Sequence, residues 1–84
     1  KLTQNYPNPF NPSTKIDYAL PQATQVTIQV FDLLGHEVST LVDAYKPAGS
    51  YSVTFDAANL NSGIYIYRLD AGSFIDTRKM LLIK

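Results

Sequence analysis

The chain has 84 residues, 45% of them hydrophobic and 12% aromatic, which is the composition of one folded domain and excludes a disordered chain. Seven basic residues balance seven acidic ones, so no basic surplus points to nucleic acid or an anionic membrane as a partner. There is no cysteine, which excludes disulfides, thiolate catalysis and zinc–thiolate sites.

The first segment with a distinct composition is NYPNPFNPST, residues 5–14, in which Asn-Pro pairs alternate with aromatic residues. Asn-Pro pairs favour successive turns, because proline fixes φ, and a flexible linker would not need Tyr6 and Phe10. A proline-rich ligand in a polyproline II conformation would contain fewer asparagines. We therefore expect residues 1–14 to be an ordered lead-in whose Tyr6 and Phe10 pack on a domain formed by residues 15–84.

Strand periodicity runs through the rest of the chain, where apolar and polar residues alternate over short stretches. The alternation is clear in TKIDYALP, QVTIQVFD, GSYSVTFD and GIYIYRLD, and further strands are expected at about residues 37–41 and 74–83. Turn-forming residues separate these stretches, and VSTLVDA could form one helical turn. The sequence shows no internal repeat. This pattern predicts a small, all-β, antiparallel β-sandwich in a single domain over residues 1–84.

Candidate catalytic groups are sparse, and we assign none. The one histidine, His36, lies beside Gly35 and Glu37 in an expected turn with no nucleophile nearby. The domain is too small for the loops that would place a glycosidase-type carboxylate pair in a cleft. We expect a protein that is not an enzyme and needs no cofactor. The acids at strand ends and turns, which commonly cap their own backbone, are Asp17, Asp32, Glu37, Asp43, Asp56, Asp70 and Asp76.

One oxygen-rich cluster, Asp56, Asn59 and Asn61 in DAANLNSG, raises the possibility of a calcium site, because calcium takes oxygen ligands from such loops. The spacing does not match a known calcium loop, and a network of Asx turns would use the same residues. We assign no metal site, and weak calcium binding at these three residues stays an open alternative.

The tyrosines raise a second alternative, a sugar-binding platform. Tyr51, Tyr65 and Tyr67 lie in expected strands with a spacing of two residues. Side chains at that spacing share one face of a strand, which favours packing into the core or onto the sheet. We expect packing to be their role.

Five stretches follow one another in an order that resembles a known family: NYPNPFNPST, VFDLLGHEV, KPAGSYSVTFD, LNSGIYIYRL and KMLLIK. Over residues 5–84 the chain resembles the type A C-terminal sorting domain of the type IX (Por) secretion system of Bacteroidetes and related bacteria. It is also similar to the immunoglobulin-like domain of flagellar hook-capping proteins. The resemblance implies an immunoglobulin-like β-sandwich of about seven strands.

The resemblance also implies a delivery function without catalysis. Domains of this family lie at the C-terminus of large exported proteins, pass through the periplasm and direct their cargo through the outer-membrane translocon. A surface peptidase then commonly removes the domain, so we expect the cell surface or the medium as the destination. Lys1 starts the chain without Met or a signal peptide, and we expect a fragment excised from a larger secreted protein. No apolar run approaches the roughly 20 residues that span a bilayer, so no integral membrane segment is expected.

The family's motifs match three places in this chain. The chain departs from the family at Ser52 and Val53, where some members have two apolar residues. A serine at position 52 should destabilise the fold little if its side chain faces outward. We expect the first two motifs to be mainly fold determinants, because they define turns and fill a core. The matching residues are Pro47, Gly49, Tyr51 and Val53 in the Pro-x-Gly-x-Tyr-x-Val segment, Gly63 and Tyr65 in the Gly-x-Tyr segment, and Lys79, Met80, Leu81, Leu82, Ile83 and Lys84 in the terminal strand.

The terminal strand is apolar on both faces, whereas a solvated edge strand would alternate. Met80 and Leu82 lie on one face, and Leu81 and Ile83 lie on the other. We expect the direct recognition element in residues 79–84, read through strand addition or through the basic ends, with burial between sheets as the other explanation. The alternative function is an accessory module of a secreted multidomain protein, either an immunoglobulin-like adhesion domain or a carbohydrate-binding domain.

Overall fold

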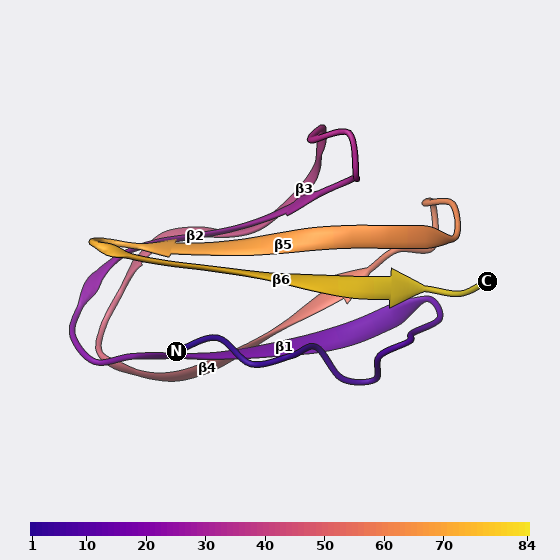
Figure 1. The fold of residues 1–84 in the computed structure, drawn as a ribbon. Coiled ribbons are helices and arrows are strands. Elements are labelled where there is room, and N and C mark those ends of the chain that lie inside the picture. Colours follow the sequence, from indigo (N-terminus) through magenta and orange to yellow (C-terminus); the bar gives the residue numbers. More distant parts are fainter.

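The computed structural model describes residues 1–84 and contains strands but no helix. β1 and β4 form an antiparallel two-stranded sheet, and the order β3-β2-β5-β6 forms a four-stranded sheet that faces it (Figure 1). The prediction of an all-β antiparallel sandwich is therefore confirmed. No helix that could cross a membrane is present. The six strands are β1 (Ser13–Leu20), β2 (Thr24–Phe31), β3 (Glu37–Lys46), β4 (Gly49–Asp56), β5 (Gly63–Ala71) and β6 (Phe74–Leu82).

The core lies between the two sheets and is built from the inward positions of the alternating strands. Ile16 of β1, Ile28 of β2 and Leu69 of β5 are each 0% exposed, and Tyr67 is as deeply buried. Burial of aliphatic side chains of this size contributes about 1.5–3 kcal/mol each. The fold is thus stabilised by the inward side chains that the period-two pattern places in the core.

The strand β3 is longer than expected, and VSTLVDA, which could have formed one helical turn, is part of this strand. The helix-like spacing of Val38, Leu41 and Val42 arises from bulges in the pairing of β3 with β2, where Ile28 faces Val42 but Gln29 faces Thr40. Each bulge adds one residue to β3 and shifts which side chains face inward. The three apolar side chains consequently pack against the core from one extended strand.

The lead-in forms a seventh, irregular strand along β1. The backbone N–H of Thr3 donates to the C=O of Asp17 at 3.1 Å. Tyr6 and Lys15 exchange two hydrogen bonds of 2.9 Å each, in the antiparallel manner. The expected number of about seven strands is therefore reached only when the lead-in is counted with the six regular strands.

The lead-in then crosses to the other sheet and runs parallel to β6. Phe10 N–H donates to Leu81 C=O at 3.0 Å, and Ile83 N–H donates to Phe10 C=O at 3.0 Å. Phe10 is 2% exposed, as predicted. Tyr6 is 78% exposed, so the expectation that its ring packs on the sandwich is wrong. Side chains alternate along an added strand, and Asn5, at 2% exposure, takes the inward position instead.

Two core tyrosines set an alkaline limit to stability. Burial raises the pKa of Tyr67 and of Tyr18 above the ordinary value of about 10, and the neighbouring Tyr51 adds to the effect at Tyr18. The folded state holds these protons more tightly than the unfolded chain. Their contribution to stability is therefore present below about pH 10 and is lost as the pH rises through the raised values.

We expect the midpoint of urea unfolding to fall as the pH is raised above about 10, and the Tyr67→Phe variant to show a weaker dependence. Phenolate absorbance, followed in parallel, should show two tyrosines that ionise late. A midpoint that is constant through this range in the unmodified domain would contradict the expectation.

Candidate functional site

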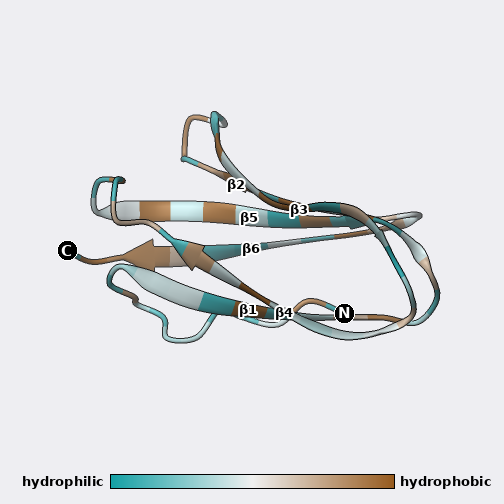
Figure 2. Cartoon of the chain, turned by 180° about the vertical axis from the view of Figure 1, so that it is seen from behind, coloured by the Kyte–Doolittle hydropathy of each residue, from teal (hydrophilic) through white to brown (hydrophobic).

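The predicted recognition segment comprises the end of β6 and the two residues after it. Met80 and Leu82 are 1% and 0% exposed and belong to the core, whereas Leu81 and Ile83 are 36% and 50% exposed. The two apolar faces of this segment therefore have different roles, since one builds the sandwich and the other meets solvent. Figure 2 shows the resulting hydrophobic end of β6 beside the C-terminus.

An apolar patch surrounds the exposed face of this segment. Ile64 of β5 lies opposite Leu81 in the sheet register and is 42% exposed. We call Ile64, Leu81 and Ile83 the C-terminal patch. Lys79 lies in the register opposite Ile66, and its ammonium has no acidic partner, because the ion pairs of the structure form elsewhere. The patch therefore combines apolar surface with one free cation.

The backbone edge of the same segment is already occupied. The N–H of Leu81 donates to Asn8 Oδ1 at 3.0 Å, and its C=O accepts from Phe10 N–H at 3.0 Å. The C=O of Lys79 accepts from Gln4 Nε2 at 2.6 Å. A strand that was to be added at this edge would first have to displace the lead-in. In this conformation the side chains of Lys79, Leu81 and Ile83, rather than the backbone of this segment, are open to a partner.

The last residue holds the loop between β4 and β5. Lys84 Nζ donates to the carbonyls of Ala58 and Leu60 at 2.6 and 2.9 Å, and Lys84 N–H donates to Ser62 Oγ at 3.0 Å. The ammonium thus satisfies two loop carbonyls. Lys84 has a structural role that sequence reasoning missed, because its partners lie more than twenty positions away.

The oxygen-rich residues considered for calcium lie in this loop. Asp56 Oδ1 accepts from the N–H of Ala58 at 3.0 Å, which is the contact that the Asx-turn alternative requires. Asn59 and Asn61 are exposed. No group of three or more His, Cys, Asp or Glu side chains in the structure could hold a metal ion.

The tyrosines of the two internal motifs each make the same kind of contact, a hydrogen bond to a backbone carbonyl. Tyr65 Oη donates to Asn61 C=O at 2.7 Å, and Tyr51 Oη donates to Pro47 C=O at 2.6 Å, four residues upstream in both cases. PAGSY and NSGIY are thus a short repeat, x-x-Gly-x-Tyr, which sequence analysis overlooked although the identical spacing was visible. The glycines between the partners have positive φ, +147° at Gly49 and +153° at Gly63, which favours glycine over residues with a side chain.

The tyrosines are packed, as predicted, and do not form an open sugar-binding platform. Tyr65 and Tyr67 are 7% and 0% exposed. Tyr51 is half-buried and stacks on Tyr18 with a centroid distance of 5.3 Å, while the Lys46 ammonium lies 5.2 Å from the Tyr51 ring. Their faces are therefore covered by the protein's own side chains.

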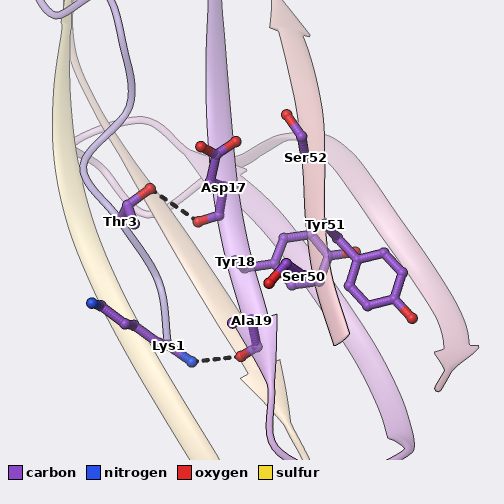
Figure 3. Close-up of a pocket in the computed structure, with 8 residues that line it drawn as sticks. All are labelled: Lys1, Thr3, Asp17, Tyr18, Ala19, Ser50, Tyr51 and Ser52. Atoms are coloured by element: carbon purple, nitrogen blue, oxygen red, sulfur yellow. Dashed lines mark hydrogen bonds between the residues drawn. The ribbon is translucent and has the colours of Figure 1, made fainter. Parts of the chain in front are cut away.

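The largest surface hollow, about 450 Å³, lies over β1 and β4 (Figure 3). Its polar wall includes the hydroxyls of Ser50 and Ser52 and the carboxylate of Asp17, and the backbone nitrogen of Lys1 donates to Ala19 C=O at 2.6 Å. Ser52 is exposed, as its position in the motif predicts. Ser52 lies opposite Asp17 in the pairing of β1 with β4, and no hydrogen bond joins their side chains.

His36 belongs to the turn between β2 and β3. Asp32 Oδ1 accepts from the N–H groups of Leu34 and His36 at 2.9 Å each, and His36 Nδ1 lies 3.2 Å from Asp32 Oδ2. The hydrogen bond from His36 N–H is the main cause that lowers the pKa of Asp32. The histidine thus stabilises a surface turn, which agrees with its assignment from the sequence.

The strand order and the contact of Tyr65 define an immunoglobulin-like β-sandwich. In such domains a tyrosine near the start of the second-to-last strand, the place of β5 here, hydrogen-bonds back to the backbone a few residues upstream. Tyr65 occupies that place in β5. The chain belongs to the secretion system C-terminal sorting domain family, whose model matches residues 4–84, and it is thereby a sorting domain of type IX (Por) secretion. A comparison with curated proteins finds no match.

Proposed function

We propose that this domain carries an attached cargo protein from the periplasm through the outer-membrane type IX translocon, and that a surface peptidase then removes it. The family match over residues 4–84 is the observation that supports this function. The domain acts as a recognised surface and performs no chemistry. Its cargo is upstream in the same polypeptide, and its destination is the cell surface or the medium.

We further propose that the translocon reads the C-terminal patch together with Lys79. Leu81 and Ile83 continue the core-building strand but turn their side chains to solvent, and Ile64 extends the apolar area on the neighbouring strand. Apolar side chains gathered on an exposed face mark an interaction site more often than scattered ones do. Met80 and Leu82 support recognition only by holding the strand in place. Lys84 is engaged with its own loop and contributes to the fold.

An export assay tests this proposal. Residues 1–84 are fused to a periplasmic reporter in a host with type IX secretion, and the double variant Leu81→Ser/Ile83→Ser is compared with Ile75→Ser. Ile75 is a matched control because it is 61% exposed near the other end of β6. Two lost apolar contacts of about 1 kcal/mol each would reduce delivery by about tenfold or more. The control should be delivered like the parent domain.

Two outcomes separate the parts of the proposal, and one further variant tests the cation. Normal delivery of the folded Leu81→Ser/Ile83→Ser variant would contradict recognition through the patch. A parent fusion that stays in the periplasm would contradict the sorting function and favour an accessory module. The Lys79→Ala variant tests the cation alone, whereas Lys84→Ala would also disturb the loop between β4 and β5.

A further inference from the structure

The lead-in is held in a slot between the two sheets. On one side it pairs with the edge of β1, where Ala19 N–H donates to Lys1 C=O at 2.8 Å and Tyr6 and Lys15 exchange two hydrogen bonds. On the other side it pairs with the edge of β6 through Phe10. The slot therefore offers hydrogen-bonding groups on both walls, arranged for a strand that is antiparallel to β1 and parallel to β6.

Two apolar side chains fix the lead-in in this slot. Leu2 and Phe10 are 1% and 2% exposed, and the Phe10 ring lies 6.1 Å from the Phe55 ring, centroid to centroid. The rings are tilted by 56°, an arrangement that aromatic pairs favour. The interior of the slot thus accepts one aliphatic and one aromatic side chain, eight positions apart on a segment that bends between Pro7 and Pro9.

The lead-in can leave the slot without breaking any other strand pair. The pairs β1–β4, β2–β3, β2–β5 and β5–β6 are formed by the regular strands alone. The lead-in itself is paired through isolated bridges, at Leu2, Tyr6 and Phe10, and a segment with few ladder bonds opens at a lower free-energy cost than a central strand does. Its departure would expose the C=O of Lys79, the N–H and C=O of Leu81 and the N–H of Ile83 along one edge.

We propose that the lead-in is an exchangeable strand, and that the slot beneath it is a binding site for a segment of a partner protein that follows the same bent course as the lead-in. The partner segment would place an aromatic side chain where Phe10 lies and an aliphatic one where Leu2 lies, and would run parallel to β6. This is strand addition at a two-sided site. The use of the site during secretion rests on the function proposed above, but the site itself does not.

Hydrogen exchange of the intact domain tests whether the slot opens. The amides of Lys15 and Ile83 and that of Leu81 are bonded to the lead-in, and they should exchange about tenfold or more faster than the amides of β2 and β5. Exchange of both groups at one common rate, by global unfolding, would overturn the proposal.

A peptide with the sequence of residues 1–12 tests whether the open slot binds a strand in trans. The full chain with Phe10→Ala is titrated with this labelled peptide and with the same peptide carrying Phe10→Ala. The unmodified peptide should bind about tenfold or more tightly than the altered one, and the parent domain should bind it weakly because its own lead-in competes at a high effective concentration. Chemical shift changes are expected at Lys15, Leu81 and Ile83.

Equal binding of both peptides, or no binding to a folded variant, would overturn the proposal. If Phe10→Ala does not fold, Asn8→Ala takes its place, because it removes the bond to Leu81 N–H and leaves the core intact. The peptide titration needs no secretion machinery. A failure here therefore leaves the export assay untouched, and a failed export assay leaves this result standing.

Discussion

A domain that lacks Lys79–Lys84 is expected to be unfolded. The deletion removes Met80 and Leu82 from the core, and truncation of such side chains costs about 2–5 kcal/mol each. It also removes the pairing of β6 with the first residues of β5 and with the lead-in. Since small domains have roughly 5–15 kcal/mol of stability in total, the losses together consume most or all of it.

Urea unfolding followed by circular dichroism measures this effect. The deletion variant should show no cooperative transition, whereas Leu81→Ser/Ile83→Ser should unfold within about 1 kcal/mol of the parent, because both side chains face solvent. A deletion variant with a native-like transition would show that β6 is dispensable for the fold. For the same reason, truncation of this segment in an export assay does not separate recognition from folding, and point substitutions on the exposed face do.

Tyr65→Ala is expected to destabilise the domain by about 3–5 kcal/mol, the range for large aromatic side chains in a core. Tyr65→Phe removes only the hydroxyl that donates to Asn61 C=O and should cost about 1–1.5 kcal/mol. Tyr51→Phe removes the equivalent bond to Pro47 from a half-buried position and should cost less. We therefore expect the Tyr65 contact before β5 to stabilise the domain more than the Tyr51 contact before β4.

Free energies from urea unfolding test the ranking, with Tyr6→Ala as the control. Tyr6 is 78% exposed, so its substitution should change stability by less than about 0.5 kcal/mol. Equal costs for Tyr65→Phe and Tyr6→Ala would show that the hydroxyl contact carries no net stabilisation.

The regular strands were predictable because one side of each faces a core, which imposes the period of two on Ile16, Ile28 and Leu69. The same rule failed in β3, since bulges opposite Ile28 and Val30 break the alternation and make the spacing look helical. Local sequence therefore encodes an element only where its register is unbroken.

The lead-in and the terminal segment were only partly predictable, because their partners are distant in the sequence. Whether Asn5 or Tyr6 faces inward depends on the pairing of the lead-in with β1. The composition of NYPNPF predicts that the aromatic Tyr6 is buried, but the structure buries Asn5 instead. That Leu82 is buried and Ile83 exposed depends on the sheet that β6 joins. The role of Lys84 depends on a loop whose course no local pattern reveals.

The bonds between the lead-in and β6 join residues as far apart in the chain as Gln4 and Lys79, 75 positions from each other. A polypeptide that ends before residue 79 cannot close the sandwich along this line, however well its earlier strands have formed. The closed sandwich can therefore form only after the ribosome has synthesised β6. A machinery that accepts only the closed form would export finished cargo and leave prematurely terminated chains behind.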